Sequence, residues 1–171
     1  TIKAGGIVAH DLKGSLVDDT NSLMNSEWIP YQSHMLMMGQ DITADSLGNT
    51  ADPNNIASAD NLKFSETLRT LFIGEDSGNH TNNFLWAYNV DTKTLDRILS
   101  TPAGAESTGL HAVDSVNGWT YIMSNFQHPG DSSKLTDELK ATVLENYNDG
   151  YSACVGYITA DPIAPSIEKK A

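Results

Sequence analysis

The sequence has very few of the residues that build disulfide frameworks or basic binding surfaces. It contains one cysteine, Cys154, so no disulfide can form within the chain and no thiolate cluster can bind a metal. We expect Cys154 to be a buried, small hydrophobic residue of a strand. Lys and Arg number 10 against 22 Asp and Glu, which gives a net charge of -12. Because nucleic-acid binding requires a basic face, this composition argues against nucleic acid as a partner.

Long hydrophobic runs are also absent. No stretch approaches the roughly 20 apolar residues of a membrane span, and no basic-then-apolar signal peptide stands at the start. Hydrophobic residues make up 39% of 171 positions, enough for one folded domain with a core. Because the chain opens at Thr1, we interpret it as a piece of a longer protein, with 161–171 as a flexible polar tail.

Short apolar segments separated by turn signals predict a mainly β fold. "LWAYNV" and "TLDRILS" flank the turn "DTKT", and "HAVDSV" and "WTYIMSN" flank the dipeptide Asn117-Gly118, a strong hairpin signal. This rhythm is typical of antiparallel hairpins in the blades of a β-propeller, or of a sandwich. Further strands are predicted at 5–10, 34–40, 61–66, 69–76 and 151–160, and we expect the strand over 34–40 to be buried.

Three other segments depart from this pattern. Residues 133–149 predict a helix near the C-terminus, capped by Ser133 or Thr136 and stopped by Gly150. Residues 41–59 have loop composition, and they are either a solvated excursion or a source of calcium ligands. The segment 15–30 is compatible with a helical turn or two before Pro30.

The stretch "GEDSGNHTNN" (74–83) is unusually rich in oxygen and nitrogen donors. Glu75 and Asp76 follow an apolar strand, and adjacent carboxylates are hard donors suited to calcium or ferric iron. The alternative is a solvated turn. We expect His80 to be exposed in this loop. Asn79-His80-Thr81 fits a glycosylation sequon, which matters only in a eukaryotic secretory context.

Other acids are candidates for the same chemistry. Glu106 lies in "AGAESTG", where flanking glycines allow a close backbone approach, and it is either a metal ligand, a phosphate-site acid or a local turn acceptor. Asp60 and Asn61 are either metal ligands or an Asx-turn that starts a strand. We interpret His111 as a strand residue and His128, before Pro129, as a structural corner.

Four segments together resemble the C-terminal part of the PhoX-type alkaline phosphatase family. They are "ADNLKFSETLRTLFIGEDS", "NNFLWAYNVDTKTLDRILS", "PAGAESTGL" and "NGWTYIMSNFQHPGD". The resemblance covers roughly residues 58–131. The acidic loop over 74–83 differs from the family's usual pattern, so we expect a divergent branch.

The resemblance implies a β-propeller phosphomonoesterase that uses calcium and iron and is exported to the periplasm or beyond. Residues 1–171 would be its last blades. Glu106 would act as a catalytic acid, and Glu75, Asp76, Asp60 and Asn61 would bind metal. The implied partners are a phosphorylated small molecule and either the remainder of the propeller or a second copy. The alternatives are a non-catalytic, calcium-stabilised propeller that serves as a binding module, and a self-contained β-rich domain.

Overall fold

The computed structural model describes residues 1–18, 20–24, 26–147 and 151–159. Within these ranges the protein is mainly β, with one helix near the C-terminal end, as predicted. The helix α1 spans Asp137–Asn146. The strands are β1 Gly6–Lys13, β2 Ile29–Met38, β3 Ala59–Ser65, β4 Thr70–Glu75, β5 Asn82–Asn89, β6 Leu95–Ala103, β7 Glu106–Val116, β8 Trp119–Gln127 and β9 Cys154–Thr159.

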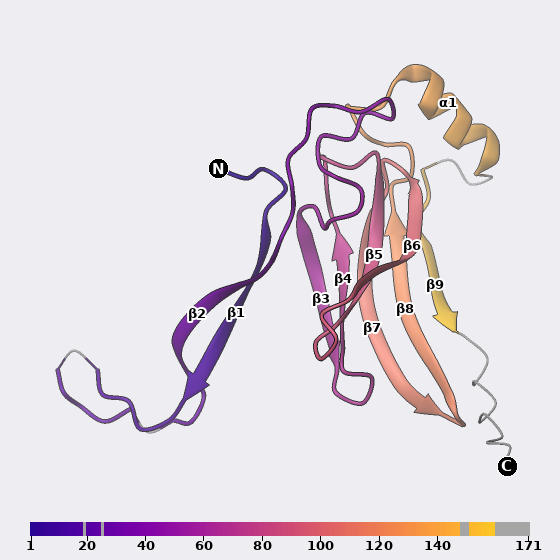
Figure 1. The fold of residues 1–171 in the computed structure, drawn as a ribbon. Helices are drawn as coiled ribbons and strands as arrows, with labels where there is room; N and C mark the ends of the chain where they lie inside the picture. Colours follow the sequence, from indigo (N-terminus) through magenta and orange to yellow (C-terminus); the bar gives the residue numbers. More distant parts are fainter. Residues whose placement is uncertain (19, 25, 148–150, 160–171) are drawn as a thin grey trace, which may run out of the picture.

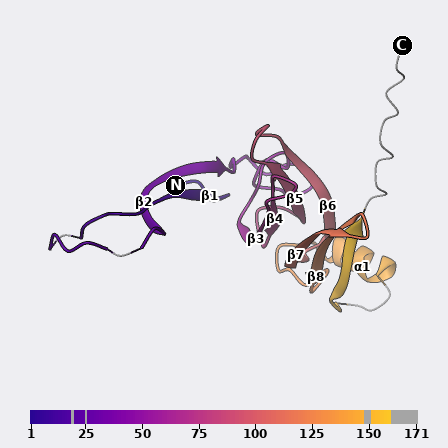
Figure 2. The same ribbon diagram turned by 90° about the horizontal axis from the view of Figure 1, so that it is seen from below.

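The strands form antiparallel sheets that follow one another in chain order (Figure 1). The first is the hairpin β1-β2, the second is the meander β3-β4-β5-β6, and the third is β7-β8-β9, with α1 inserted between its last two strands. Seen from below, the hairpin extends away from the four-stranded sheet, and the third sheet lies on the other side (Figure 2). The antiparallel hairpins predicted from the sequence are therefore confirmed.

Turn residues with positive φ explain why the strands reverse where they do. Asn117 and Gly118 have φ values of 53° and 85° between β7 and β8, as a two-residue hairpin loop with both central residues left-handed requires. Lys93, with φ of 63°, reverses the chain between β5 and β6. Both turns lie where the sequence places them.

The main core lies on one face of β4 and β5. Ile73 and Trp86 are cross-strand partners there, and they pack with Ile56, Phe84, Tyr88 and Ile7 in one buried cluster. Their neighbours Phe72 and Leu85 point to the opposite face and are also buried. Strands covered on both faces read as continuous apolar runs, which is why "TLFI" and "FLWAY" show no polar alternation.

The second and third sheets contact each other through β3, β4 and β7. Gly74 lies against Ser107, and a Cβ at Gly74 would be 3.0 Å from the Ser107 carbonyl oxygen. Further along the same strands, the Ser65 hydroxyl donates to Asp114 Oδ1 at 2.7 Å. The absence of a side chain at Gly74 lets the two sheets approach closely.

Several local predictions are wrong. No helical turn forms over 15–30 in its described residues, where a β-bridge joins Val17 and Leu23 instead. The methionine-rich segment is indeed a strand, part of β2, but it is largely exposed, with Met35 53% accessible. Only its base packs on the core, through Leu36 and Met37. A two-stranded hairpin that projects from the sheet has too little protein around it to bury both faces.

The C-terminal region is partly as predicted. Thr136 caps α1 by accepting a hydrogen bond from the Leu139 amide, so the helix begins later than the expected residue 133. The strand over 151–160 is realised as β9. Cys154 is exposed there and not buried, because β9 is the last strand of its sheet among the described residues. The expected tail over 161–171, and Gly150, lie outside the described residues.

The expected loop over 41–59 is confirmed as a connection, since β3 begins only at Ala59. It is not a solvated excursion, because Ala51, Ile56 and Ala57 are buried. Its aspartates fold it locally: Asp45 accepts hydrogen bonds from the amides of Leu47 and Asn49 and from the Asn49 side chain. No helix among the described residues is long and apolar enough to cross a membrane.

Candidate functional site

Glu75, at the end of β4, is completely buried and fully hydrogen-bonded. Oε1 accepts from the Ala57 amide at 2.8 Å and from Trp86 Nε1 at 2.7 Å. Oε2 accepts from the Phe84 amide at 3.0 Å and lies 3.0 Å from His80 Nδ1. Backbone and indole N–H groups donate to both oxygens, and His80 Nδ1 lies at hydrogen-bond distance, so the carboxylate ties three segments together within the core.

His80 is buried beside Glu75, so the expectation of an exposed histidine is wrong. Its Nε2 lies 3.3 Å from the Asp52 carbonyl oxygen, and its ring packs against Phe84 with centroids 5.1 Å apart. The next residue, Thr81, donates its amide to Asn49 Oδ1 at 2.8 Å. The polar residues that follow β4 therefore hold the connection 41–58 against the sheet. Their hydrogen-bonding groups have a structural role there.

Asp76 is the acid that the loop leaves exposed. Its amide donates to the Ser58 carbonyl, while its carboxylate has no hydrogen-bond partner among the described residues. Partial desolvation raises the pKa of Asp76, and the negative charges of Glu106 and Asp60 raise it further, against a smaller opposing effect of His128. Three carboxylates and one imidazole therefore share a local electrostatic field.

Glu106 opens β7 directly beside this acid. Its Oε2 accepts from the Gln127 side chain and lies 3.4 Å from His128 Nε2. Among the described residues its hydrogen bonds all involve Oε2, so Oε1 remains available. His128 has φ of 43°, which confirms the expected corner. Its Nδ1 is buried and has no hydrogen-bond partner within the part of the chain that the structure describes.

Asp60 and Glu106 occupy equivalent places in consecutive sheets. A left-handed residue precedes each: Ser58 with φ of 47° before Ala59-Asp60, and Gly104 with φ of 75° before Ala105-Glu106. Both acids lie in the first two residues of a strand, β3 and β7. The side chain of Asn61, next to Asp60, donates to the Ser107 carbonyl at 3.4 Å. The packing of β3 on β7 thus brings the two strand starts together.

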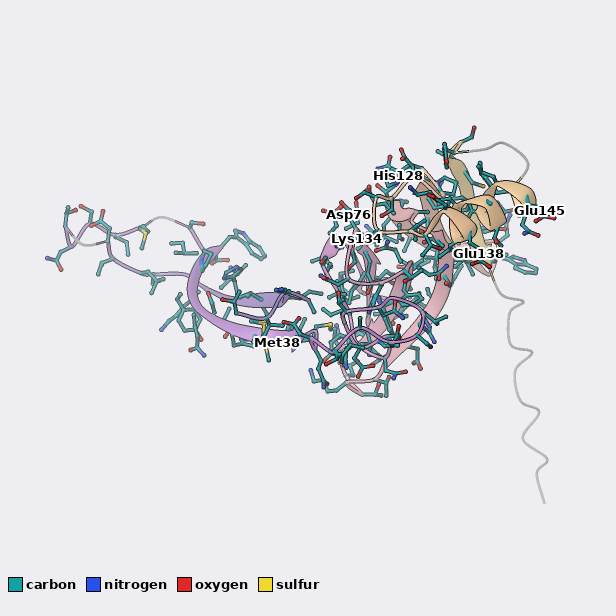
Figure 3. The ribbon with its side chains drawn as sticks, turned by 90° about the horizontal axis from the view of Figure 1, so that it is seen from above. Met38, Asp76, His128, Lys134, Glu138 and Glu145 are labelled. Carbon is teal, nitrogen blue, oxygen red and sulfur yellow. The ribbon has the colours of Figure 1, made fainter. Side chains whose placement is uncertain are left out.

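A cleft of about 490 Å³ lies at this end of the sheets. Asp76, His128 and Lys134 lie near one another there (Figure 3). Acidic and basic side chains line it together with loop backbone and the start of α1. The acidic ones are Asp45, Asp76, Glu106 and Asp131, and the basic ones are His80, His128 and Lys134. Asp60 and Asn61 lie beside the cleft and not in its lining. Lys134 Nζ donates to the Gly78 carbonyl across the cleft.

The structure therefore separates the expected site residues. Asp76 and Glu106 share the cleft, Asp60 acts on it electrostatically, and Glu75 lies in the core. Sequence reasoning missed Lys134 and Asp131, which follow the "QHPG" corner; their proximity to this motif was the available signal. Asn79 of the sequon is hydrogen-bonded to Thr50 and Lys3.

The class defined by this fold is a mainly antiparallel β protein with an acid-rich cleft at the start of packed strands. Comparison of the chain with protein-family models, curated proteins and solved structures gives no match. Among the residues that the structure describes, no three His, Cys, Asp or Glu side chains are arranged to hold a metal ion.

Proposed function

We propose that the chain contributes Asp76 and Glu106 as ligands to a hard-cation site in a phosphatase-like metalloprotein. The observation that carries the proposal is the pairing of exposed Asp76 with Glu106 in one cleft, with Asp60 nearby. Partial desolvation and the negative charges of Glu106 and Asp60 raise the pKa of Asp76, so its ionised form costs free energy that a bound cation relieves. Calcium and ferric iron both prefer such oxygen donors.

The surroundings of these acids fit a cation better than a bare phosphate. Asp45, Asp76, Glu106 and Asp131 outnumber the basic groups of the lining, and Lys134 already donates to Gly78. A phosphate monoester would be repelled here unless a metal neutralised the acids. A bound metal polarises a phosphoryl oxygen and activates a nucleophile. In this proposal Glu106 serves the reaction beside His128, whose Nδ1 is buried and has no hydrogen-bond partner among the described residues.

The sheet order supports a propeller setting for this site. A four-stranded meander followed by a packed three-stranded sheet is compatible with two consecutive blades. Asp60 and Glu106 then open the first strand of each blade, where the blades of a propeller converge. The remaining ligands would come from further blades or a second copy, in a protein exported to the periplasm or outside the cell.

A calcium titration followed by thermal melting tests the cation site. Calcium at about 100 times its Kd adds about 2.7 kcal/mol to the stability of a protein that binds it only when folded. We expect this rise in the parent chain and in Asp96→Asn, an exposed acid on β6. We expect none in the double variant Asp76→Asn, Glu106→Gln. Equal stabilisation of all three proteins, or no stabilisation of a full-length protein that supplies the remaining ligands, would contradict the proposal.

A non-catalytic, calcium-stabilised binding module is the second candidate. It is favoured by the hydrogen bond of Lys134 to Gly78, which occupies the lysine of the cleft. Hydrolysis of p-nitrophenyl phosphate with added calcium and iron separates the two candidates. Turnover that Glu106→Gln abolishes supports the phosphatase, whereas calcium stabilisation of the full-length protein without turnover supports the module.

A further inference from the structure

His80 is a titratable residue with no part in the proposed cation site, and its side chain is completely buried. Its Nδ1 lies 3.0 Å from Glu75 Oε2, and its Nε2 lies 3.3 Å from the carbonyl oxygen of Asp52. A neutral imidazole has one donor nitrogen and one acceptor nitrogen, whereas the imidazolium has two donors. Because both ring nitrogens of His80 face oxygen atoms, the imidazolium is the form that satisfies both contacts.

The other partners of Glu75 indicate where the proton lies. A hydrogen on Oε2 of a neutral Glu75 would also satisfy the contact with His80 Nδ1, so the two arrangements differ in which groups are charged. The carboxyl oxygens accept hydrogen bonds from the amides of Ala57 and Phe84 and from Trp86 Nε1. Three N–H donors directed at one carboxyl group favour its ionised form, and an ionised carboxylate at 3.0 Å favours the protonated imidazole.

The wider surroundings of His80 contain ionisable groups of both signs. Its ring packs on Phe84, and the guanidinium of Arg97 lies over the Phe84 ring, 4.5 Å from the centroid. Apart from Glu75, the ionisable groups on the elements around His80 are Asp52 on the connection, Arg97 on β6, and the cleft residues Asp45, Asp76, Glu106, Asp131, His128 and Lys134. Acids outnumber bases in this set, so the wider field also favours a positive charge on His80.

The two hydrogen-bonding contacts of His80 connect its charge to the position of the connection 41–58, which lines part of the cleft. His80 Nε2 contacts this connection at Asp52, and the Thr81 hydroxyl donates to the Leu47 carbonyl. If Nε2 lost its proton, its lone pair would face the Asp52 carbonyl oxygen, and two acceptors would then repel each other in a buried site. The neutral form of His80 therefore disfavours the observed position of the connection.

We propose that His80 is a proton-dependent clamp: its imidazolium holds the connection 41–58 against the sheet at neutral pH and releases it as the pH rises. The clamp consists of the contacts of His80 with Glu75 and Asp52. It does not require a cation at Asp76 and Glu106, so it can be present whether or not the cation site is.

The clamp makes stability fall as the pH rises. A free histidine side chain loses its proton near pH about 6.5, whereas the folded chain keeps the proton on His80. Above that pH the folded state therefore binds one more proton than the unfolded state does. The folding equilibrium constant should then fall by up to about tenfold for each unit of pH.

Nitrogen-15 NMR of the histidine rings tests the charge of His80 in the unmodified chain. At pH 7.5 both ring nitrogens of His80 should have the chemical shifts of an imidazolium, whereas the exposed His111 should be largely neutral. Through-space contacts with Phe84 assign the His80 signal without any substitution. As the pH rises further, loss of the His80 proton should be accompanied by changes in the amide signals of Asn49 and Asn55.

Urea unfolding between pH 6.5 and pH 8.5 measures the proton linkage. The parent chain and His111→Gln, a substitution of an exposed histidine, should lose stability by similar amounts as the pH rises. His80→Gln should show a flatter dependence, and if this variant does not fold, the NMR titration of the parent chain decides. Three results would overturn the proposal: a neutral His80 ring at pH 7.5, deprotonation that leaves the amide signals of the connection unchanged, or equal pH dependence of His80→Gln and the parent chain.

Discussion

At the scale of single residues, neighbouring acids in this chain do different work. Glu75 and Asp76 are adjacent in sequence, yet Glu75 accepts three hydrogen bonds in the core and lies beside His80, whereas Asp76 is exposed at the cleft. The reason is the strand geometry, which directs successive side chains to opposite sides. Glu75 therefore contacts Trp86 and His80, whereas Asp76 experiences the negative charge of Glu106.

Glu75→Gln should destabilise the protein by about 2–4 kcal/mol, because an amide NH2 would then face N–H donors in a buried site. Urea unfolding measures the change. Glu66→Gln, at an exposed position between β3 and β4, should change stability by less than about 0.5 kcal/mol. Equal effects of the two substitutions would show that the Glu75 network contributes little to stability.

Asp76→Asn should raise the melting temperature of the metal-free protein at pH 7. The pKa of Asp76 is raised in the fold, so its ionised form opposes folding, and this cost is absent below its ordinary pKa of 3.8 and develops as pH rises through the raised pKa. Melting in EDTA between pH 3 and pH 8 should therefore show a gain, of less than about 1 kcal/mol, that disappears in acid. The same gain at every pH would contradict this electrostatic origin.

At the scale of elements, the contact between the second and third sheets depends on a missing side chain. A Cβ at Gly74 would lie 3.0 Å from the Ser107 carbonyl oxygen and 3.2 Å from its hydroxyl. These distances are tighter than most Cβ contacts in proteins, so Ser107 would have to shift by a few tenths of an ångström. The position of Glu106, one residue before Ser107, depends on this contact.

Gly74→Ala should therefore cost about 1–3 kcal/mol, as overpacking of a close interface does. Gly156→Ala on β9 is the matched control, because its added Cβ meets nothing within 4 Å. Thermal denaturation of both variants gives the comparison. If Gly74→Ala were as stable as Gly156→Ala, the two sheets would be free to separate slightly at no cost.

At the scale of the whole molecule, several aspartate side chains stabilise loops by accepting hydrogen bonds. Hydrogen bonds from Thr20, Lys3 and Asn49, respectively, lower the pKa values of Asp18, Asp41 and Asp45. Asp41, for example, accepts from the amides of Lys3 and Ala4 at 2.9 and 2.8 Å. A net charge of -12 is thus no measure of cation binding by itself.

The sequence by itself determined the local structure. Asn117-Gly118 specifies its hairpin because both residues tolerate positive φ, and the apolar runs of β4 and β5 specify buried strands. Thr136 was an identifiable cap, and the pattern of turns predicted a mainly β chain. These features depend on neighbours in sequence, which is why they can be predicted from it.

Only the tertiary structure decided which polar residues share a site. His80 is buried because the connection 41–58 folds back over it, and Cys154 is exposed because no described strand follows β9 in its sheet. Glu75, an expected metal ligand, instead accepts hydrogen bonds from Trp86, Ala57 and Phe84 in the core. Lys134, which lies in a loop distant in sequence, lines the cleft. Burial and hydrogen-bond partners are set by contacts between segments far apart in sequence, and side-chain chemistry alone does not encode them.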